Sequence, residues 1–100
     1  MGVFAVRAHW GYEEEGGYLF AYCLEDKIKI SSAVYGVKAY YWGWLCHADV
    51  SGVLQKECDD KHDCYLAVDD ATLNTAPCKT AGKKLLTYSW YCFSDGHYDE

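Results

Sequence analysis

Six cysteines within 100 residues constrain this chain more than any other feature of its sequence. Such a density in so short a chain is typical of domains that fold in an oxidising compartment and are stabilised by disulfides. Six cysteines predict three disulfides, but their number alone does not select one pairing. Four of the six lie between Cys58 and Cys92. The sequence therefore predicts a small domain whose last third is held by crosslinks.

Length and composition predict one globular domain over residues 1–100. The apolar share is 51%, aromatic residues make up 17%, and there is one proline, which suits a modest core. The net charge is −6 and no Lys or Arg cluster stands out, which argues against nucleic acids and anionic membranes as partners. No apolar run approaches the length of a membrane span, so we expect no membrane insertion.

Hydrophobic alternation predicts that strands dominate the fold. It is clearest over residues 27–30, where Ile28 and Ile30 would face inward, and over residues 84–92. The latter segment would place four side chains on one face: Leu86, Tyr88, Trp90 and Cys92. We expect further extended segments over residues 3–10, 18–24, 31–37 and 65–68.

The segments between these strands predict turns and one or two short helices. Residues 11–17 carry three glutamates between glycines and predict an acidic turn. Residues 49–57 are the best helix candidate, with Asp49 or Ser51 as the cap. Residues 69–80 predict a polar loop or a short helical turn, and residues 94–100 a frayed tail. The expected fold is therefore α+β, a small antiparallel sheet or sandwich with one or two short helices.

The ordered motifs resemble the sea-urchin-egg-lectin-type domain, the rhamnose- and galactose-binding lectins, and in particular the related C-terminal module of plant β-galactosidases. That family closes with Asp-Pro-Cys, a short loop and Lys-Tyr-Leu-Glu-Val-Ser-Tyr-x-Cys, where this chain has Ala76-Pro77-Cys78 and then residues 84–92. The family's Cys-x-Gly-Lys-x-x-Cys is similar to residues 58–64, and its Ala-Asn-Tyr-Gly-Arg to residues 33–37. The resemblance spans about residues 14–92, and it implies the same fold.

The resemblance also implies how the cysteines pair. Family members usually carry one further disulfide, and both of its cysteines are missing here, with Glu14 at the place of the first. Because those two cysteines pair with each other in the family, their joint loss leaves no unpaired thiol. The pairs implied for this chain are Cys23–Cys92, Cys46–Cys78 and Cys58–Cys64.

In the family, the sugar lies in a shallow pocket lined by an acidic residue, a tyrosine, polar residues and a lysine. The resemblance implies Glu15, Tyr35, either Asp69 or Asp70, and Lys84 for these places. A carboxylate beside a charged donor suits vicinal hydroxyls, because each hydroxyl both donates and accepts hydrogen bonds. Structural interpretations stand beside these roles: a solvated turn carboxylate for Glu15, a core ring for Tyr35 and an exposed edge lysine for Lys84.

Two positions depart from the family pattern of sugar-binding residues. Ala76 stands where the family has Asp, and Val37 where it often has Arg. Loss of a carboxylate that holds a hydroxyl costs about 1–3 kcal/mol. We therefore expect these departures to shift the sugar specificity or to abolish weak monosaccharide binding.

An aromatic run over residues 40–44 takes the place of the missing disulfide. Trp42 and Trp44 are candidates for stacking against a longer glycan or a protein partner. Alternatively the rings turn inward and fill the space of the crosslink, which we expect for at least one tryptophan.

Metal and catalytic sites are not expected. Cys58, His62 and Cys64 offer zinc ligands, but paired Cys-x2-Cys motifs are absent and the cysteines have disulfide partners. The aspartates lack the glycine that a calcium loop requires. The four histidines accompany no nucleophile motif, and no Gly-rich phosphate loop is present. We expect neither a cofactor nor enzyme activity.

The resemblance implies a calcium-independent lectin for galactose- or rhamnose-like sugars, with glycans or glycoproteins as partners. Arg7 and His9 interrupt the first apolar stretch, so it is not typical of a signal peptide. We expect a mature secreted domain, with a cytosolic, unexported protein as the alternative. The alternative hypothesis is a divergent lectin fold that has lost monosaccharide binding and recognises an extracellular protein through its aromatic run. No sequence feature specifies an oligomeric state.

Overall fold

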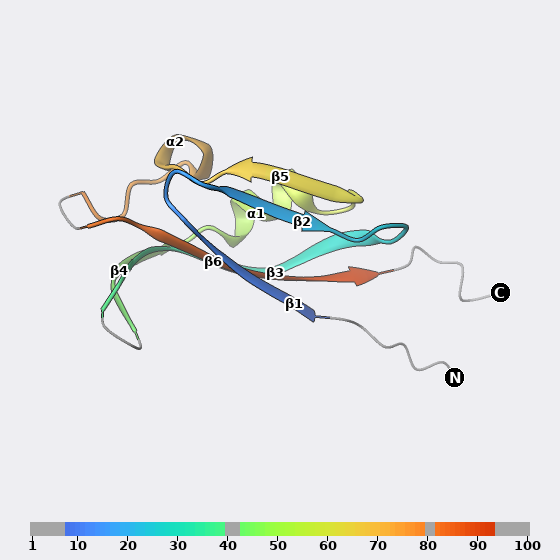
Figure 1. Ribbon diagram of the computed structural model, residues 1–100, viewed down its shortest axis with the longest axis horizontal. Helices are drawn as coiled ribbons and strands as arrows, with labels where there is room; N and C mark the ends of the chain where they lie inside the picture. The colour runs from blue at the N-terminus through green and yellow to red at the C-terminus, as the bar shows by residue number, and fades with distance from the viewer. Residues whose placement is uncertain (1–7, 40–42, 80–81, 94–100) are drawn as a thin grey trace.

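Two antiparallel sheets form the domain in the computed structural model, which describes residues 8–39, 43–79 and 82–93. The larger sheet has the strand order β1-β6-β3-β4, and the smaller one pairs β2 with β5. Figure 1 shows the smaller sheet lying over the larger one as a second layer. In chain order the strands are β1 (Ala8–Glu14), β2 (Tyr18–Tyr22), β3 (Lys27–Lys38), β4 (Trp44–Asp49), β5 (Asp63–Ala67) and β6 (Leu85–Phe93).

Two short helices complete the fold, α1 (Ser51–Cys58) and α2 (Asp70–Leu73). The α+β architecture predicted from the sequence is confirmed, and α1 lies within two residues of the predicted helix. The predicted cap at Asp49 or Ser51 is wrong, because Val50 is the N-cap and makes no side-chain cap hydrogen bond. Asp49 lies just before it and accepts a hydrogen bond from the Ser51 backbone N–H at 2.8 Å. Among the described residues, no helix has the length and apolarity needed to cross a membrane.

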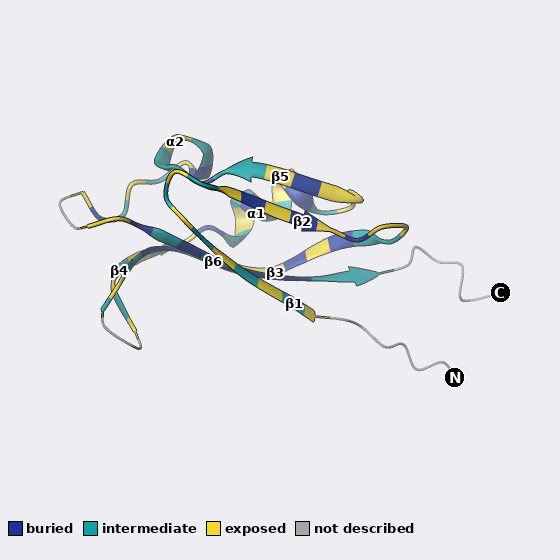
Figure 2. Ribbon diagram, viewed as in Figure 1, coloured by how far each residue is buried: buried dark blue, intermediate teal, exposed yellow. Residues whose placement is uncertain are grey.

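The core lies between the two sheets and is closed on one side by α1. Alternate residues of β2 point into it, as the alternating buried and exposed bands of that strand show in Figure 2. The predicted inward positions Ile28 and Ile30 of β3 are buried, as are Leu86, Tyr88 and Trp90 of β6. The alternation therefore predicts these inner positions correctly, although Cys92 at the end of the β6 face is only half-buried and Ser89 on the opposite face is buried as well.

All three predicted disulfides are present. Cys23–Cys92 joins the residue after β2 to the end of β6, so it crosslinks the two layers. Cys46–Cys78 ties β4 to the loop after α2. Cys58–Cys64 joins the end of α1 to β5. No free cysteine remains in the chain.

Strand β1 corrects the predicted acidic turn over residues 11–17, because it continues to Glu14 in register with β6. Gly11 pairs with Tyr88, and a Cβ atom at Gly11 would lie 2.6 Å from the tyrosine ring. The glycine therefore makes room for a ring that crosses the strand and does not mark a turn. Strand β4 was not predicted from the sequence. Residues 3–7 of the predicted first strand, and the predicted tail 94–100, lie outside the described residues.

A bulge in β3 decides which side Tyr35 faces. Ile30 pairs with Trp90 while Ser32 pairs with Ser89, so Ser31 is an extra residue without a partner in the register. Because side chains alternate along a strand, one extra residue moves all later side chains to the opposite face. Ala33 and Tyr35 thus point into the same core as Ile28 and Ile30. The next residue, Gly36, lies so close to β4 that a Cβ atom there would overlap the carbonyl oxygen of Cys46.

Candidate functional site

The turn between β1 and β2 fixes Glu15 at one end of the molecule, next to two other segments. The Glu15 backbone N–H donates to the Lys84 carbonyl oxygen at 2.9 Å, just before β6 begins. The Gly16 N–H donates to the Val68 carbonyl oxygen at 2.9 Å, two residues before α2. Gly16 has a φ of +98°, a conformation that glycine adopts without strain. Backbone hydrogen bonds therefore assemble three distant segments.

Lys84 lies at the centre of this assembly and is only 8% exposed. Its backbone N–H donates to Glu15 Oε1 at 3.1 Å, and its Nζ lies 3.5 Å from Glu15 Oε2. The same Nζ lies 3.3 Å from Oδ1 of Asp70. An ammonium group this deeply buried needs charge partners, and two carboxylates supply them. The alternative of an exposed edge lysine is therefore wrong.

Asp69 and Asp70, which the sequence did not distinguish, have different surroundings. Asp69 caps α2, and its Oδ1 accepts a hydrogen bond from the Thr72 N–H at 2.7 Å, which lowers the pKa of this carboxyl. Asp70 is the first residue of α2 and turns its carboxylate to Lys84. The cap therefore positions the neighbouring carboxylate that joins the cluster.

We expect Asp69→Ala to weaken any binding that depends on the position of Asp70, because α2 loses its cap. Asp69→Asn is the matched control, since asparagine caps helices equally well. Ligand titrations and thermal unfolding of both variants measure the effect. Equal losses in both variants would show that the charge of Asp69, and not its capping bond, matters.

Tyr35 supports the cluster from the core. Its hydroxyl donates to Asp70 Oδ1 at 2.8 Å, and Lys84 Nζ lies 5.9 Å from its ring centroid. The side chain is fully buried, so the ring offers no face to a ligand, and the expected place of Tyr35 in the lining of the sugar pocket is corrected to a core role. Burial raises the pKa of Tyr35 far above its usual range, and the hydrogen bond to Asp70 and the charge of Glu15 add to the increase.

Tyr35→Phe should lower the free energy of unfolding by about 1–2 kcal/mol near neutral pH, because Asp70 loses a donor. Since the folded-state pKa of Tyr35 is raised, the unfolded chain loses this proton first as the pH rises past about 10. The stabilisation by Tyr35 is therefore complete below about pH 10 and declines above it. Urea unfolding at pH 8 and pH 11 should show the gap between wild type and variant shrinking, with the exposed Tyr65→Phe as control. A gap that stays constant or widens would contradict this account.

The cluster of Glu15, Asp70 and Lys84, supported by Tyr35, is hereafter called the charged cluster. The side chains of Glu15 and Asp70 are 32% and 40% exposed, so their carboxylates reach solvent although Lys84 does not. Each carboxylate has more acceptor sites than the cluster uses. Two carboxylates against one ammonium leave a net negative site, which suits neutral ligands with several hydroxyl donors and disfavours anions.

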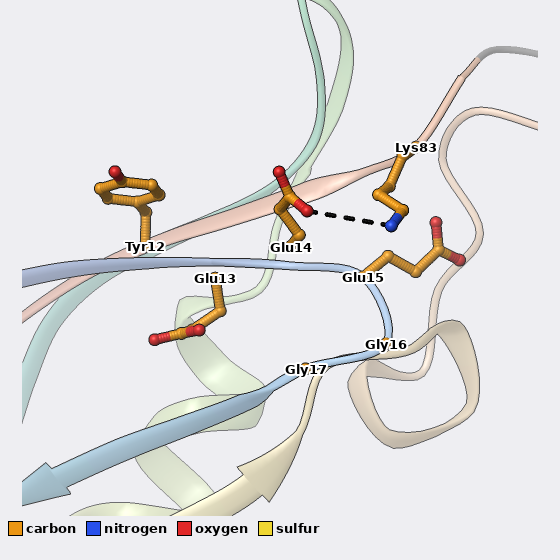
Figure 3. A pocket seen from close by; sticks show the side chains of 7 residues that line it. All are labelled: Tyr12, Glu13, Glu14, Glu15, Gly16, Gly17 and Lys83. Atoms are coloured by element: carbon orange, nitrogen blue, oxygen red, sulfur yellow. Dashed lines mark ion pairs between the residues drawn. The ribbon is translucent and has the colours of Figure 1, made fainter.

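A cleft of about 530 Å³ adjoins the charged cluster and shares Glu15 with it. Figure 3 shows Tyr12 and Glu14 projecting from the same side of β1, with Lys83 beside Glu14. The Lys83 Nζ lies 3.8 Å from Glu14 Oε1. Tyr12 and Glu14 were not predicted as site residues, because residues 11–17 were interpreted as a turn, and Lys83 was not predicted either. The sequence does carry a signal for this strand face, because smaller or inward-facing residues alternate with Trp10, Tyr12 and Glu14.

Of the two tryptophans in the aromatic run, the structure describes Trp44. The Trp44 ring is half-buried, with Lys38 Nζ 4.8 Å from its centroid and the His47 ring 5.8 Å away. Trp42 lies outside the described residues. Of the two departures from the resembled family, Ala76 is exposed and Val37 is half-buried in β3. Trp44 lies on the edge strand β4 and lines neither described cleft.

A larger cleft of about 980 Å³ lies at the opposite end of β6, where the Trp90 ring stacks on His9 at 5.0 Å. Its described lining includes the acidic residues Glu25 and Asp26 but no lysine or arginine. It therefore lacks the combination of ammonium and carboxylates that distinguishes the charged cluster. No group of three or more His, Cys, Asp or Glu side chains within the described ranges is placed to hold a metal ion.

Comparison with models of known protein families finds no match to this chain, and a search of curated proteins finds no significantly similar sequence.

Proposed function

We propose that this domain binds a galactose- or rhamnose-like sugar residue at the charged cluster, without calcium. The observation that carries the proposal is the juxtaposition of Lys84 with the half-exposed carboxylates of Glu15 and Asp70. Carboxylates accept hydrogen bonds from neighbouring sugar hydroxyls, and hydrogen bonds with one charged partner are the stronger ones. Binding requires no covalent step, so the proposal is a recognition module and not an enzyme.

The roles of the residues follow from their surroundings. Glu15 and Asp70 present acceptors to the ligand, while Lys84 holds both carboxylates in place from below. Tyr35 fixes Asp70 through its hydroxyl and does not contact the sugar. This arrangement is preorganised, because each polar group is already held by a partner on a strand or at a helix start. The three disulfides are typical of an oxidising compartment and support an extracellular location.

Affinity chromatography tests the proposal directly. The oxidised protein should be retarded on immobilised D-galactose or L-rhamnose, and the matching free sugar should elute it. EDTA should leave the retardation unchanged, since no calcium is involved. Unretarded passage through both columns, or elution by EDTA, would refute the proposal.

A protein-recognition role is the second candidate, and exposed aromatic rings on the outer face of the β2–β5 sheet favour it. The Tyr18 and Tyr65 rings stack in parallel at 4.9 Å, and Phe20 lies edge-on to Tyr65 at 6.1 Å. Exposed aromatic groups of this kind are enriched in protein interfaces. Under this alternative, Tyr65→Ala would abolish capture of the partner, whereas Lys84→Ala would not.

A further inference from the structure

We propose that the ligand extends beyond one sugar residue, and that the cleft beside the charged cluster is a second subsite formed by Tyr12, Glu14 and Lys83. This inference rests on the proposed function, because it assigns the first residue of the ligand to the charged cluster. The cleft of about 530 Å³ falls within the range of about 300–1,000 Å³ that is typical of small-molecule sites.

The charged cluster and the cleft are continuous with each other. Glu15 lines the cleft and also contacts Lys84 through both carboxylate oxygens. A ligand held by Glu15 therefore already stands at the mouth of the cleft. Gly16 and Gly17 form the adjoining turn, and a Cβ added at Gly16 would meet nothing within 4 Å. The end of the cleft next to Glu15 is consequently free of side chains from the turn.

The spacing along β1 gives the second argument. Tyr12 and Glu14 are two residues apart on one face, which separates them by roughly 7 Å. Glu15 follows the end of β1 and lies in the turn to β2, beyond both of these side chains. A ring linked to the one bound at Glu15 can therefore extend along this face toward Tyr12. In Figure 3, Glu13 also lines the cleft but points to the other side of the strand from Tyr12 and Glu14.

The chemistry of the three side chains fits a second sugar and gives the third argument. Tyr12 is 70% exposed, so its ring can cover the apolar C–H face of a sugar. Glu14 and Lys83 form an exposed ion pair next to Tyr12 and provide acceptors and donors for hydroxyl groups. An aromatic face combined with a few convergent polar groups is the usual composition of such sites. The occupant we infer is the second residue of a neutral oligosaccharide.

Isothermal titration or amide-shift titration can test the second subsite with defined sugars. The probes are methyl galactoside and methyl rhamnoside, against lactose, melibiose and a rhamnose disaccharide. At least one disaccharide should bind about tenfold more tightly than its monosaccharide. Tyr12→Ala should remove that advantage and leave monosaccharide affinity unchanged. Tyr12→Phe should retain it, as should Tyr18→Ala, which removes an exposed tyrosine outside the cleft.

The neighbouring residues Lys83 and Lys84 distinguish the two sites, because replacing either one by alanine changes the net charge by the same amount. Lys83→Ala should weaken disaccharide binding only, whereas Lys84→Ala should abolish binding of both sugar classes. Equal affinities for monosaccharides and disaccharides, or an advantage that survives Tyr12→Ala, would overturn the second subsite while sugar binding at the charged cluster stands. The absence of binding by every probe would overturn the proposed function, and the second subsite with it.

Discussion

Replacing both Cys23 and Cys92 by alanine should lower the free energy of unfolding by about 4 kcal/mol, because the lost crosslink closes a loop of sequence separation 69. A domain of this size is stabilised by about 5–15 kcal/mol in total, so the loss removes a large share of its stability. The bond also joins the two layers of the fold at the ends of β2 and β6. Urea unfolding monitored by tryptophan fluorescence measures the loss.

The Cys58–Cys64 bond is the matched control, because its sequence separation is only 6. Chain-entropy arguments give about 2 kcal/mol for so short a loop. Cys58→Ala with Cys64→Ala should therefore destabilise the domain less than removal of Cys23–Cys92. The reverse order would show that loop closure does not determine the contribution of these crosslinks.

Lys84→Ala should abolish sugar binding and also reduce stability. Without the ammonium group, Glu15 and Asp70 lose their shared partner and repel each other at the site. Their side chains are a third or more exposed, so water screens much of this repulsion, and we expect a cost of about 1–2 kcal/mol. Sugar affinity should fall by more than about tenfold, because the carboxylates are no longer held in position.

Lys56→Ala is the control for this variant. Lys56 is exposed on α1, away from the charged cluster, and its replacement changes the net charge by the same amount. It should leave both affinity and stability unchanged. A similar loss of affinity in both variants would indicate a general effect of charge and would argue against a specific role for Lys84.

The inner positions of the strands could be predicted because the alternation of apolar and polar residues is a local signal. The three disulfides could be predicted because the resemblance implied all three pairs together. Ile28 and Ile30 alternate with lysines, and this pattern is sufficient to identify the inner face of β3. The pairing of the cysteines followed from the resemblance to a lectin family. These predictions needed no knowledge of which strands lie side by side.

The orientation of Tyr35 could not be predicted, because it depends on the bulge at Ser31. Strict alternation from Ile30 would turn Tyr35 outward, where it could contact a ligand. The bulge appears only when β3 pairs with β6, so it is a property of tertiary pairing and not of local sequence. Asp69 and Asp70 could not be distinguished for a similar reason, since the start of α2 determines which carboxylate caps and which joins Lys84.

The face of β1 that carries Tyr12 and Glu14 was not predicted, because residues 11–17 were interpreted as a turn. The glycines at positions 11, 16 and 17 favour turns on either side of the three glutamates. Pairing with β6 overrides this preference as far as Glu14, and the ring of Tyr88 over Gly11 explains the glycine that suggested a turn. A long-range contact therefore places Tyr12 and Glu14 on one face.

Amide chemical shifts of the oxidised, labelled protein during titration with D-galactose and L-rhamnose test the central claim most directly. We predict saturable shifts for one sugar at Glu15, Asp70 and Lys84, with none in Lys84→Ala. Residues at the opposite end of β6, such as Cys92, should not respond. Shifts absent at tens of millimolar of both sugars, or confined to the opposite end of the molecule, would contradict sugar binding at the charged cluster.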